Sequence, residues 1–162
     1  MKRMIICAAA SAFFVNTASA DETLKYRSVY YTTSFQSQPI PDADGHLMGI
    51  VHAAGIASFP DGSVAADNFT TFVDYTKGSG PIVLSYGDVT FSDGSVLFIK
   101  SLGATITEGS QSTFKGTITI IGGKGRFAGA KGDGTFAGAR VQATQPGAGA
   151  QLYNDFILNV KK

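Results

Sequence analysis

The sequence predicts an all-β fold: a single antiparallel up-and-down β-barrel of about eight strands that follows a cleaved signal peptide. Nearly every segment after residue 20 alternates apolar with polar side chains and is rich in Thr, Val, Ile, Tyr and Phe. A period of two with this composition is typical of half-buried strands. Turn signals separate the segments, and no segment has the periodicity of an amphipathic helix. Hairpin-linked strands commonly close into a barrel, because closure removes the exposed edges of an open sheet.

Residues 1–20 have the features of a secretory signal peptide. Lys2 and Arg3 give a basic start, an apolar stretch follows, and small residues precede the expected cleavage site after Ala20. The apolar stretch is too short to span a hydrocarbon core of about 30 Å. We therefore expect an exported protein, periplasmic or secreted, that has no membrane span and whose single domain comprises residues 21–162.

Charge and cysteine content exclude several classes of function. Without Lys2 and Arg3 the chain has 11 basic and 12 acidic side chains, so no global field attracts nucleic acid. Cys7 is the one cysteine and lies in the signal segment, which excludes disulfides and thiolate chemistry from the mature chain. We expect no nucleic-acid partner and no cofactor. Stability must come from an apolar core, to which many of the 12 Phe contribute.

The first strand is predicted over residues 24–35. It ends before Pro39 and Pro41, because proline cannot donate a hydrogen bond to the ladder of a sheet. Alternation divides its large side chains between two faces, with Tyr26 and Tyr30 on one and Val29, Tyr31 and Phe35 on the other.

An internal repeat predicts the next two hairpins. Residues 55–64, GIASFPDGSV, align with residues 87–96, GDVTFSDGSV, and in each copy a strand ends in Phe before an Asp-Gly turn. Asp-Gly is a strong hairpin signal, because glycine supplies the positive φ that primed turns require. The repeat predicts a meander in which residues 46–59 pair with 63–76 and residues 82–91 pair with 95–106.

The last third of the chain is organised around a glycine-rich stretch, residues 121–140. Glycine at this density marks positive φ or closely packed backbones, so we expect a tight corner of the barrel here. Strands are predicted on either side of the corner, over residues 114–121 and 132–141, and a final strand over 151–161. The side chains expected to share a face are Phe114, Gly116, Ile118 and Ile120 before the corner, and Leu152, Phe156, Leu158 and Val160 in the final strand.

The sequence TIIGGKGRFAGAKGDGTF, residues 119–136, resembles the glycine-rich corner of allene oxide cyclase-like barrels and is more distantly similar to the dirigent proteins. The chain resembles an exported, bacterial-type member of this group. The resemblance implies a closed antiparallel barrel whose lumen takes an apolar small molecule; in the plant cyclases the lumen moulds a reactive epoxide as it cyclises. Those enzymes use a Glu and an Asn on the first strand, whereas residues 26–35 contain neither.

Four side chains are predicted to line the lumen and bind the ligand: His52, Tyr75, Tyr86 and Tyr153. A lumenal phenol can donate to an oxyanion or enolate, and His52 can act as a base with a pKa near neutrality. The alternatives, which we favour for individual residues, are packing with the hydroxyl at solvent and a hydrogen-bonded wall histidine. His46 shares a face with His52 but lies about 20 Å away, too far to bind one metal ion with it.

Two other patterns in the sequence do not indicate a catalytic or binding site. Lys124 is followed by Gly125 rather than by Ser or Thr, so the glycine-rich stretch is not a nucleotide-binding P-loop. Asp74 and Asp88 fall in the middle of predicted strands, where we expect acidic side chains to face outward into solvent.

The sequence favours an exported barrel that binds an apolar or aromatic small molecule in its lumen. Such a barrel can act as a cyclase or isomerase by holding a reactive substrate in one shape, which is catalysis by positioning. The alternative is a non-catalytic envelope or ligand-binding structural protein whose lumen is packed core. Self-association into a homo-oligomer is compatible with either, and the sequence leaves open whether the protein is an enzyme.

Overall fold

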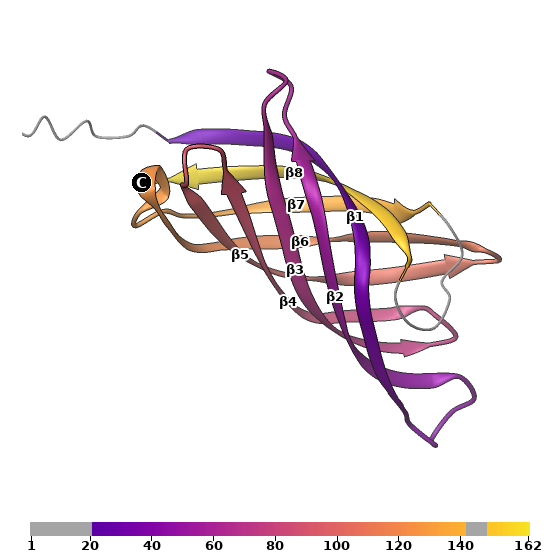
Figure 1. Cartoon of the computed structure of the whole chain (residues 1–162). Helices are drawn as coiled ribbons and strands as arrows, with labels where there is room; N and C mark the ends of the chain where they lie inside the picture. Colours follow the sequence, from indigo (N-terminus) through magenta and orange to yellow (C-terminus); the bar gives the residue numbers. More distant parts are fainter. Residues whose placement is uncertain (1–20, 142–148) are drawn as a thin grey trace, which may run out of the picture.

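The computed structural model describes residues 21–141 and 149–162. Eight strands form one closed antiparallel barrel in which strands adjacent in sequence pair and β8 closes onto β1, as Figure 1 shows. This confirms the predicted all-β up-and-down barrel, whereas the predicted signal peptide, residues 1–20, lies outside the described residues. The elements are β1 (Glu22–Pro39), β2 (His46–Ser58), β3 (Val64–Thr76), β4 (Gly80–Phe91), β5 (Val96–Glu108), β6 (Gln111–Lys124), a 3-10 turn η1 (Gly125–Phe127), β7 (Lys131–Arg140) and β8 (Gln151–Lys161).

Both hairpins predicted from the internal repeat are present. β2 pairs with β3 from His46–Thr76 to Ser58–Val64, and β4 pairs with β5 over most of their length. Each turn is a three-residue loop rather than a two-residue primed turn, since the N–H of Phe59 donates to the carbonyl of Ser63 across it. Glycine ends each loop in the left-handed region, at φ 84° for Gly62 and 79° for Gly94.

A β-bulge in β1 changes which side chains face inward. The register of β1 on β2 shifts between Thr32 and Ser34. Before the bulge, Tyr30 is buried and Tyr31 exposed, as alternation predicts. After it, Phe35 lines the interior cavity, although it was predicted to share the face of Tyr31. The prediction for Phe35 was wrong because a bulge inserts one residue and inverts the alternation beyond it.

One end of the barrel is closed by four aromatic residues, Tyr26, Phe59, Phe91 and Phe127, which we call the aromatic plug. Phe59 and Phe91 precede the two Asp-Gly turns, and their ring centroids are 5.5 Å apart. Phe91 meets Phe127 at 5.0 Å, and Tyr26 meets Phe59 at 5.1 Å. Phe127 is fully buried. The internal repeat therefore supplies half of the plug.

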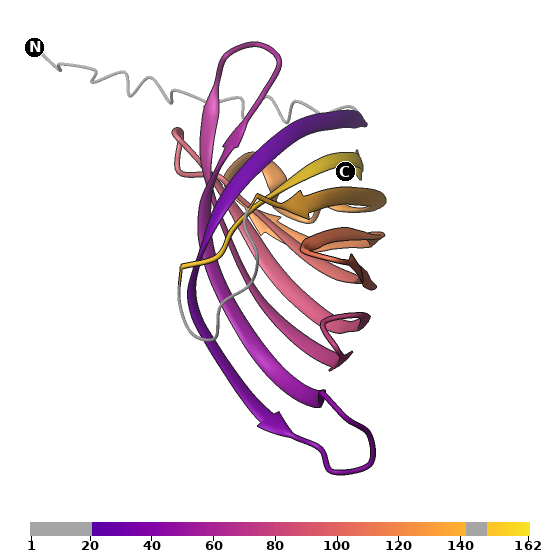
Figure 2. The same cartoon turned by 90° about the vertical axis from the view of Figure 1, so that its right-hand side faces the viewer.

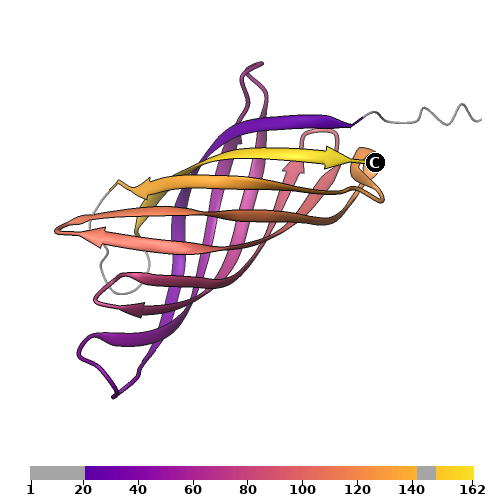
Figure 3. The same ribbon diagram turned by 180° about the vertical axis from the view of Figure 1, so that it is seen from behind.

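The glycine-rich stretch folds Phe127 into the plug. Gly125 has φ 62°, and a Cβ atom there would lie 2.5 Å from Ser95 Oγ, so both its conformation and its surroundings require glycine. The guanidinium of Arg126 covers the Phe91 and Phe127 rings at 4.3 and 4.8 Å from their centroids. Figures 1 and 3 show η1 beside the C-terminus at this end. The predicted tight corner is present, and through Phe127 it helps to close this end of the barrel.

The opposite end carries the turns between β1 and β2, β3 and β4, and β5 and β6, and it faces the viewer in Figure 2. The described residues include no helix with the length and apolarity needed to cross a bilayer.

Candidate functional site

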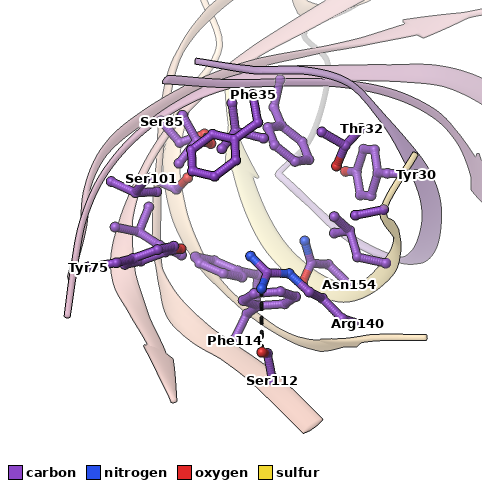
Figure 4. A pocket seen from close by; sticks show the side chains of 18 of the residues that line it. Tyr30, Thr32, Phe35, Tyr75, Ser85, Ser101, Ser112, Phe114, Arg140 and Asn154 are labelled. Atoms are coloured by element: carbon purple, nitrogen blue, oxygen red, sulfur yellow. Dashed lines mark hydrogen bonds between the residues drawn. The ribbon is translucent and has the colours of Figure 1, made fainter. Parts of the chain in front are cut away.

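A cavity of about 350 Å³ occupies the half of the barrel opposite the plug. Its lining includes Gly78 and Gly109 from the turns at the open end, and Phe136 and Phe156 from β7 and β8. The walls are mostly aliphatic and aromatic, with a few hydroxyl groups among them (Figure 4). Small-molecule sites commonly have about 300–1,000 Å³ and this mixture of apolar walls and few polar groups.

Of the four residues predicted to line the lumen, the structure places Tyr75 in the cavity wall. Tyr75 is buried, and its hydroxyl shares a hydrogen bond of 2.6 Å with Thr105 Oγ1. Burial raises the pKa of the Tyr75 phenol, and the Thr105 hydrogen bond and Arg140 partly oppose this. A role for Tyr75 in ligand binding stays a prediction.

The other three predicted residues project from the outer face of the barrel, so their expected place in the lumen was wrong. His52 Nδ1 shares a hydrogen bond of 2.9 Å with Thr70 Oγ1 and is an exposed wall histidine. Tyr86 is 46% exposed. The Tyr153 ring lies beneath the Arg27 guanidinium, 4.8 Å from its centroid.

Strand parity explains these positions. Leu152 and Phe156 are inward as predicted, and a period of two then places Tyr153 outward and Asn154 inward. On β3, Asp67 lies an even number of residues from Tyr75 and faces the same way. The alternation of β8 and β3 was therefore enough to place Asn154 and Asp67 in the lumen, although neither residue was predicted there.

Asp67 places a carboxyl group deep in the cavity. It is 1% exposed, and its Oδ2 accepts hydrogen bonds from Ser28 Oγ at 2.5 Å and from the Tyr30 hydroxyl at 2.6 Å. Neither bond uses Oδ1. Burial, with a smaller contribution from the charge of Asp88, raises the pKa of Asp67 to about 6 against the lowering effect of the two hydrogen bonds. A carboxyl with this pKa can both accept and release a proton near neutrality.

A glycine lets Tyr30 reach Asp67 across β2. Tyr30, Gly55 and Asp67 are register partners on β1, β2 and β3. A Cβ atom at position 55 would lie 2.6 Å from Cδ1 of Tyr30 and 2.3 Å from the carbonyl oxygen of Val29. The ring therefore fills the space above Gly55. Burial, followed by the charge of Asp67, raises the pKa of the Tyr30 phenol, so it remains a hydrogen-bond donor.

Arg140 brings a positive charge to the open end of the cavity. It is the last residue of β7 and lines the cavity, and its guanidinium lies 5.5 Å from the centroid of the Phe114 ring. Its Nη1 donates to Ser112 Oγ at 3.4 Å (Figure 4). Burial lowers the pKa of Arg140, and the neighbouring Tyr75 opposes this. Sequence reasoning missed Arg140, although the inward Phe136 has the same parity.

Asn154 adds an acceptor to the cavity wall. Its side chain is 7% exposed, and its Oδ1 is buried without a hydrogen-bond partner among the described residues. Figure 4 shows Asn154, Arg140 and Tyr75 reaching into the same space. In residues 21–141 and 149–162, no group of three or more His, Cys, Asp or Glu could hold a metal ion. The site offers proton transfer at Asp67 and charge recognition at Arg140.

Comparison with known proteins supports the fold. The structure of the pterocarpan synthase dirigent protein GePTS1 is similar, with a TM-score of 0.51 and 14% sequence identity over 95% of this chain and 98% of that chain. No protein-family model matches the sequence. A search of curated proteins finds no match either. The chain thus has a dirigent-type barrel fold, and the specific resemblance to allene oxide cyclase-like barrels stays a prediction.

Proposed function

We propose that this protein binds an apolar or aromatic small molecule in the open half of its barrel. The observation that carries this proposal is the hollow, largely apolar cavity with a carboxyl group held at its depth. A barrel needed only for stability has no use for such an arrangement, because a buried carboxyl costs folding free energy. Functional sites are where such costly groups gather.

The proposed binding includes a catalytic step, the isomerisation or cyclisation of the bound molecule. The cavity walls hold the substrate in one shape while Ser28 and Tyr30 fix Oδ2 of Asp67. Oδ1 of Asp67 gives a proton to one position of the substrate and takes a proton back from another, so the product is an isomer and the carboxyl group is restored. The similar barrel is described as a pterocarpan synthase, which supports a substrate-shaping role for a barrel of this kind.

The alternative is a non-catalytic binding or envelope protein with a packed lumen. Packing of this kind is found at the aromatic plug, where Phe127 is fully buried. It does not extend to the open half, where the cavity lies. This contrast favours the binding proposal over the packed-core alternative.

Two neighbouring residues on β5 provide a matched test of the lumen. Ser101 lines the cavity, whereas Leu102 is 48% exposed on the outer face. The purified protein is incubated with a small-molecule extract of its host and examined by native mass spectrometry. We expect Ser101→Phe to lose the bound molecule, because the new ring fills the cavity, and Leu102→Phe to keep it. Adducts that persist in Ser101→Phe would place the ligand elsewhere, and a wild-type protein without adducts would favour the packed-core alternative.

The catalytic step has its own test. Asp67→Asn keeps the shape and hydrogen-bond acceptor of the side chain but cannot exchange a proton. We expect this variant to retain the molecule recovered with the wild type and to stop its conversion, followed by mass and retention time. Conversion at the wild-type rate would remove Asp67 from the proposal and leave binding in place.

Export is part of the proposal and rests on the sequence of residues 1–20. We expect the protein recovered from the envelope or medium of its host to begin at Asp21, which intact mass measurement checks. Self-association of the mature barrel stays a prediction, to be tested by analytical ultracentrifugation.

A further inference from the structure

The two charged groups that line the cavity lie at different depths. β3 starts at the plug end, and Asp67 is near its start, next to Ser28 and Tyr30. β7 also starts at the plug end, but Arg140 is its last residue and therefore lies at the mouth. The lumen thus presents a carboxyl group at its depth and a guanidinium at its opening, and a bound molecule meets both.

The surroundings of Arg140 favour recognition of an anion. Its guanidinium lies against the Phe114 ring and near Tyr75, and burial lowers its pKa, which is the sign of a partly dehydrated cation. Charge–charge recognition is stronger in such surroundings than at an open surface. Its Nη1 donates to the neutral Ser112 hydroxyl at 3.4 Å, and a guanidinium forms stronger hydrogen bonds with a charged oxygen than with a neutral hydroxyl.

The depth of Asp67 fixes the direction in which such a molecule enters. An anionic head placed at the plug end would meet a second carboxyl group, and like charges close together in a buried site repel. A head placed at Arg140 meets the opposite charge and leaves the apolar body against the aromatic and aliphatic walls of the lumen. Where the body of the bound molecule carries a hydrogen-bond donor that reaches Asn154, this donor can bond to the buried Oδ1 of Asn154.

We propose that the cavity selects an amphipathic organic anion, whose carboxylate, sulfonate or similar head is bound by Arg140 at the mouth while its apolar body fills the lumen. This inference rests on the proposed small-molecule binding and adds the chemical class of the ligand. It makes Arg140 the residue that determines specificity.

Two probes with the same ring separate the anion from the apolar body. Naphthalene-2-sulfonate is anionic at every working pH, and 2-naphthalenemethanol is neutral, so calorimetric titration of both measures the contribution of the charge. We expect the wild-type protein to bind the sulfonate about tenfold or more tightly than the alcohol, because a hydrogen bond to a charged group in a partly buried site contributes at least this much. Arg140→Gln should remove that preference and leave alcohol binding within about twofold.

Two further variants make the result specific to the charge at this position. Arg140→Lys keeps the charge and should retain most of the preference. Lys115→Gln removes an exposed charge from the outer face of β6 and should change neither probe. Equal binding of both probes, or a preference for the sulfonate that survives Arg140→Gln, would overturn the inference while lumen binding stands. Failure of the wild type to bind either probe would overturn the inference together with the proposed function.

Discussion

The two ends of the barrel are built from the same alternating strands but are filled differently. At the closed end, the four aromatic rings of the plug contact one another in sequence, and Arg126 covers two of them, Phe91 and Phe127. At the open end, the inward positions of the same strands carry Tyr75, Arg140 and several hydroxyl residues around a cavity. The alternation that forms the sheet is the same throughout, so the difference comes from which side chains occupy the inward positions.

Along the length of the barrel, the plug therefore contributes mainly to stability and the cavity mainly to the proposed function. In the plug, the rings pack against one another with Tyr26 and Phe127 buried, and they keep this end of the barrel closed. The cavity half contains a buried carboxyl group and a partly buried guanidinium, both of which are costly to remove from water. The plug therefore supplies packing free energy that offsets the cost of the polar groups that line the cavity. Variants that act on one end alone can break or support this division.

The largest effect is expected from Phe127→Ala in the plug. Phe127 is fully buried, so removing its ring leaves a cavity in packed surroundings and should lower the free energy of unfolding by about 3–5 kcal/mol. The matched variant is Phe114→Ala, whose ring borders a cavity that already exists. Urea unfolding should show a clearly smaller loss for Phe114→Ala than for Phe127→Ala. Equal losses would mean that the two halves contribute alike to stability.

The same division explains how much the sequence could predict. The repeat of Phe, Asp and Gly and the glycine-rich stretch are local patterns with fixed turn chemistry, and they predicted hairpins and a corner that the structure contains. They proved to be parts of the closed end. The cavity residues Asp67, Arg140 and Asn154 belong to no motif, because their function depends on strands that are distant in sequence.

Placing those residues required knowing which face of each strand points inward. For β8 the inward Leu152 was enough, and the prediction of Tyr153 in the lumen contradicted it. For Phe35 alternation alone was misleading, because the bulge in β1 inverts it. His52 and Tyr86 were chosen for their chemistry without a partner to fix their parity. Chemistry-bearing residues in strands become predictable once a buried apolar residue on the same strand fixes the face.

Asp67→Asn provides a test at the depth of the cavity, with an effect that depends on pH. The pKa of Asp67 is about 6 in the fold, above the value of about 4 in an unfolded chain. Between these two pKa values, Asp67 is protonated in the folded protein but has lost its proton in the unfolded chain. The free energy of unfolding therefore falls as pH rises through this window. We expect Asp67→Asn to be more stable than wild type by up to about 3 kcal/mol above pH 7, and to lose this advantage near pH 4.

Urea unfolding from pH 4 to pH 8 measures this difference, and Asp133→Asn is the control. Asp133 is exposed on β7, so its replacement should leave the pH profile of the wild type unchanged. Gained stability on removal of a buried carboxyl is the expected mark of a group kept for function at the expense of folding. A variant Asp67→Asn that is less stable than wild type at pH 7 would make the carboxyl a structural member of the wall, like the residues of the plug.

The smallest effect concerns the turn between β1 and β2, which belongs to the open end and is held by charge. His46 contacts the carboxylate of Asp42 through Nδ1 and that of Asp74 through Nε2, the latter at 2.7 Å, and the hydrogen bond with Asp42 is the main cause of its raised pKa. The stabilisation is fully present below the ordinary histidine pKa of about 6.5 and is lost as pH rises through the raised value.

Amide exchange compared between about pH 5.5 and about pH 8.5, corrected for intrinsic rates, should show lost protection at the Ile40 N–H, which donates to the His46 carbonyl. The Phe59 N–H, in the equivalent position of a plug-end turn, should keep its protection, and His46→Gln should leave Ile40 poorly protected at both pH values. Parallel loss at Ile40 and Phe59 would show that the whole barrel responds to pH and that the two ends do not open independently.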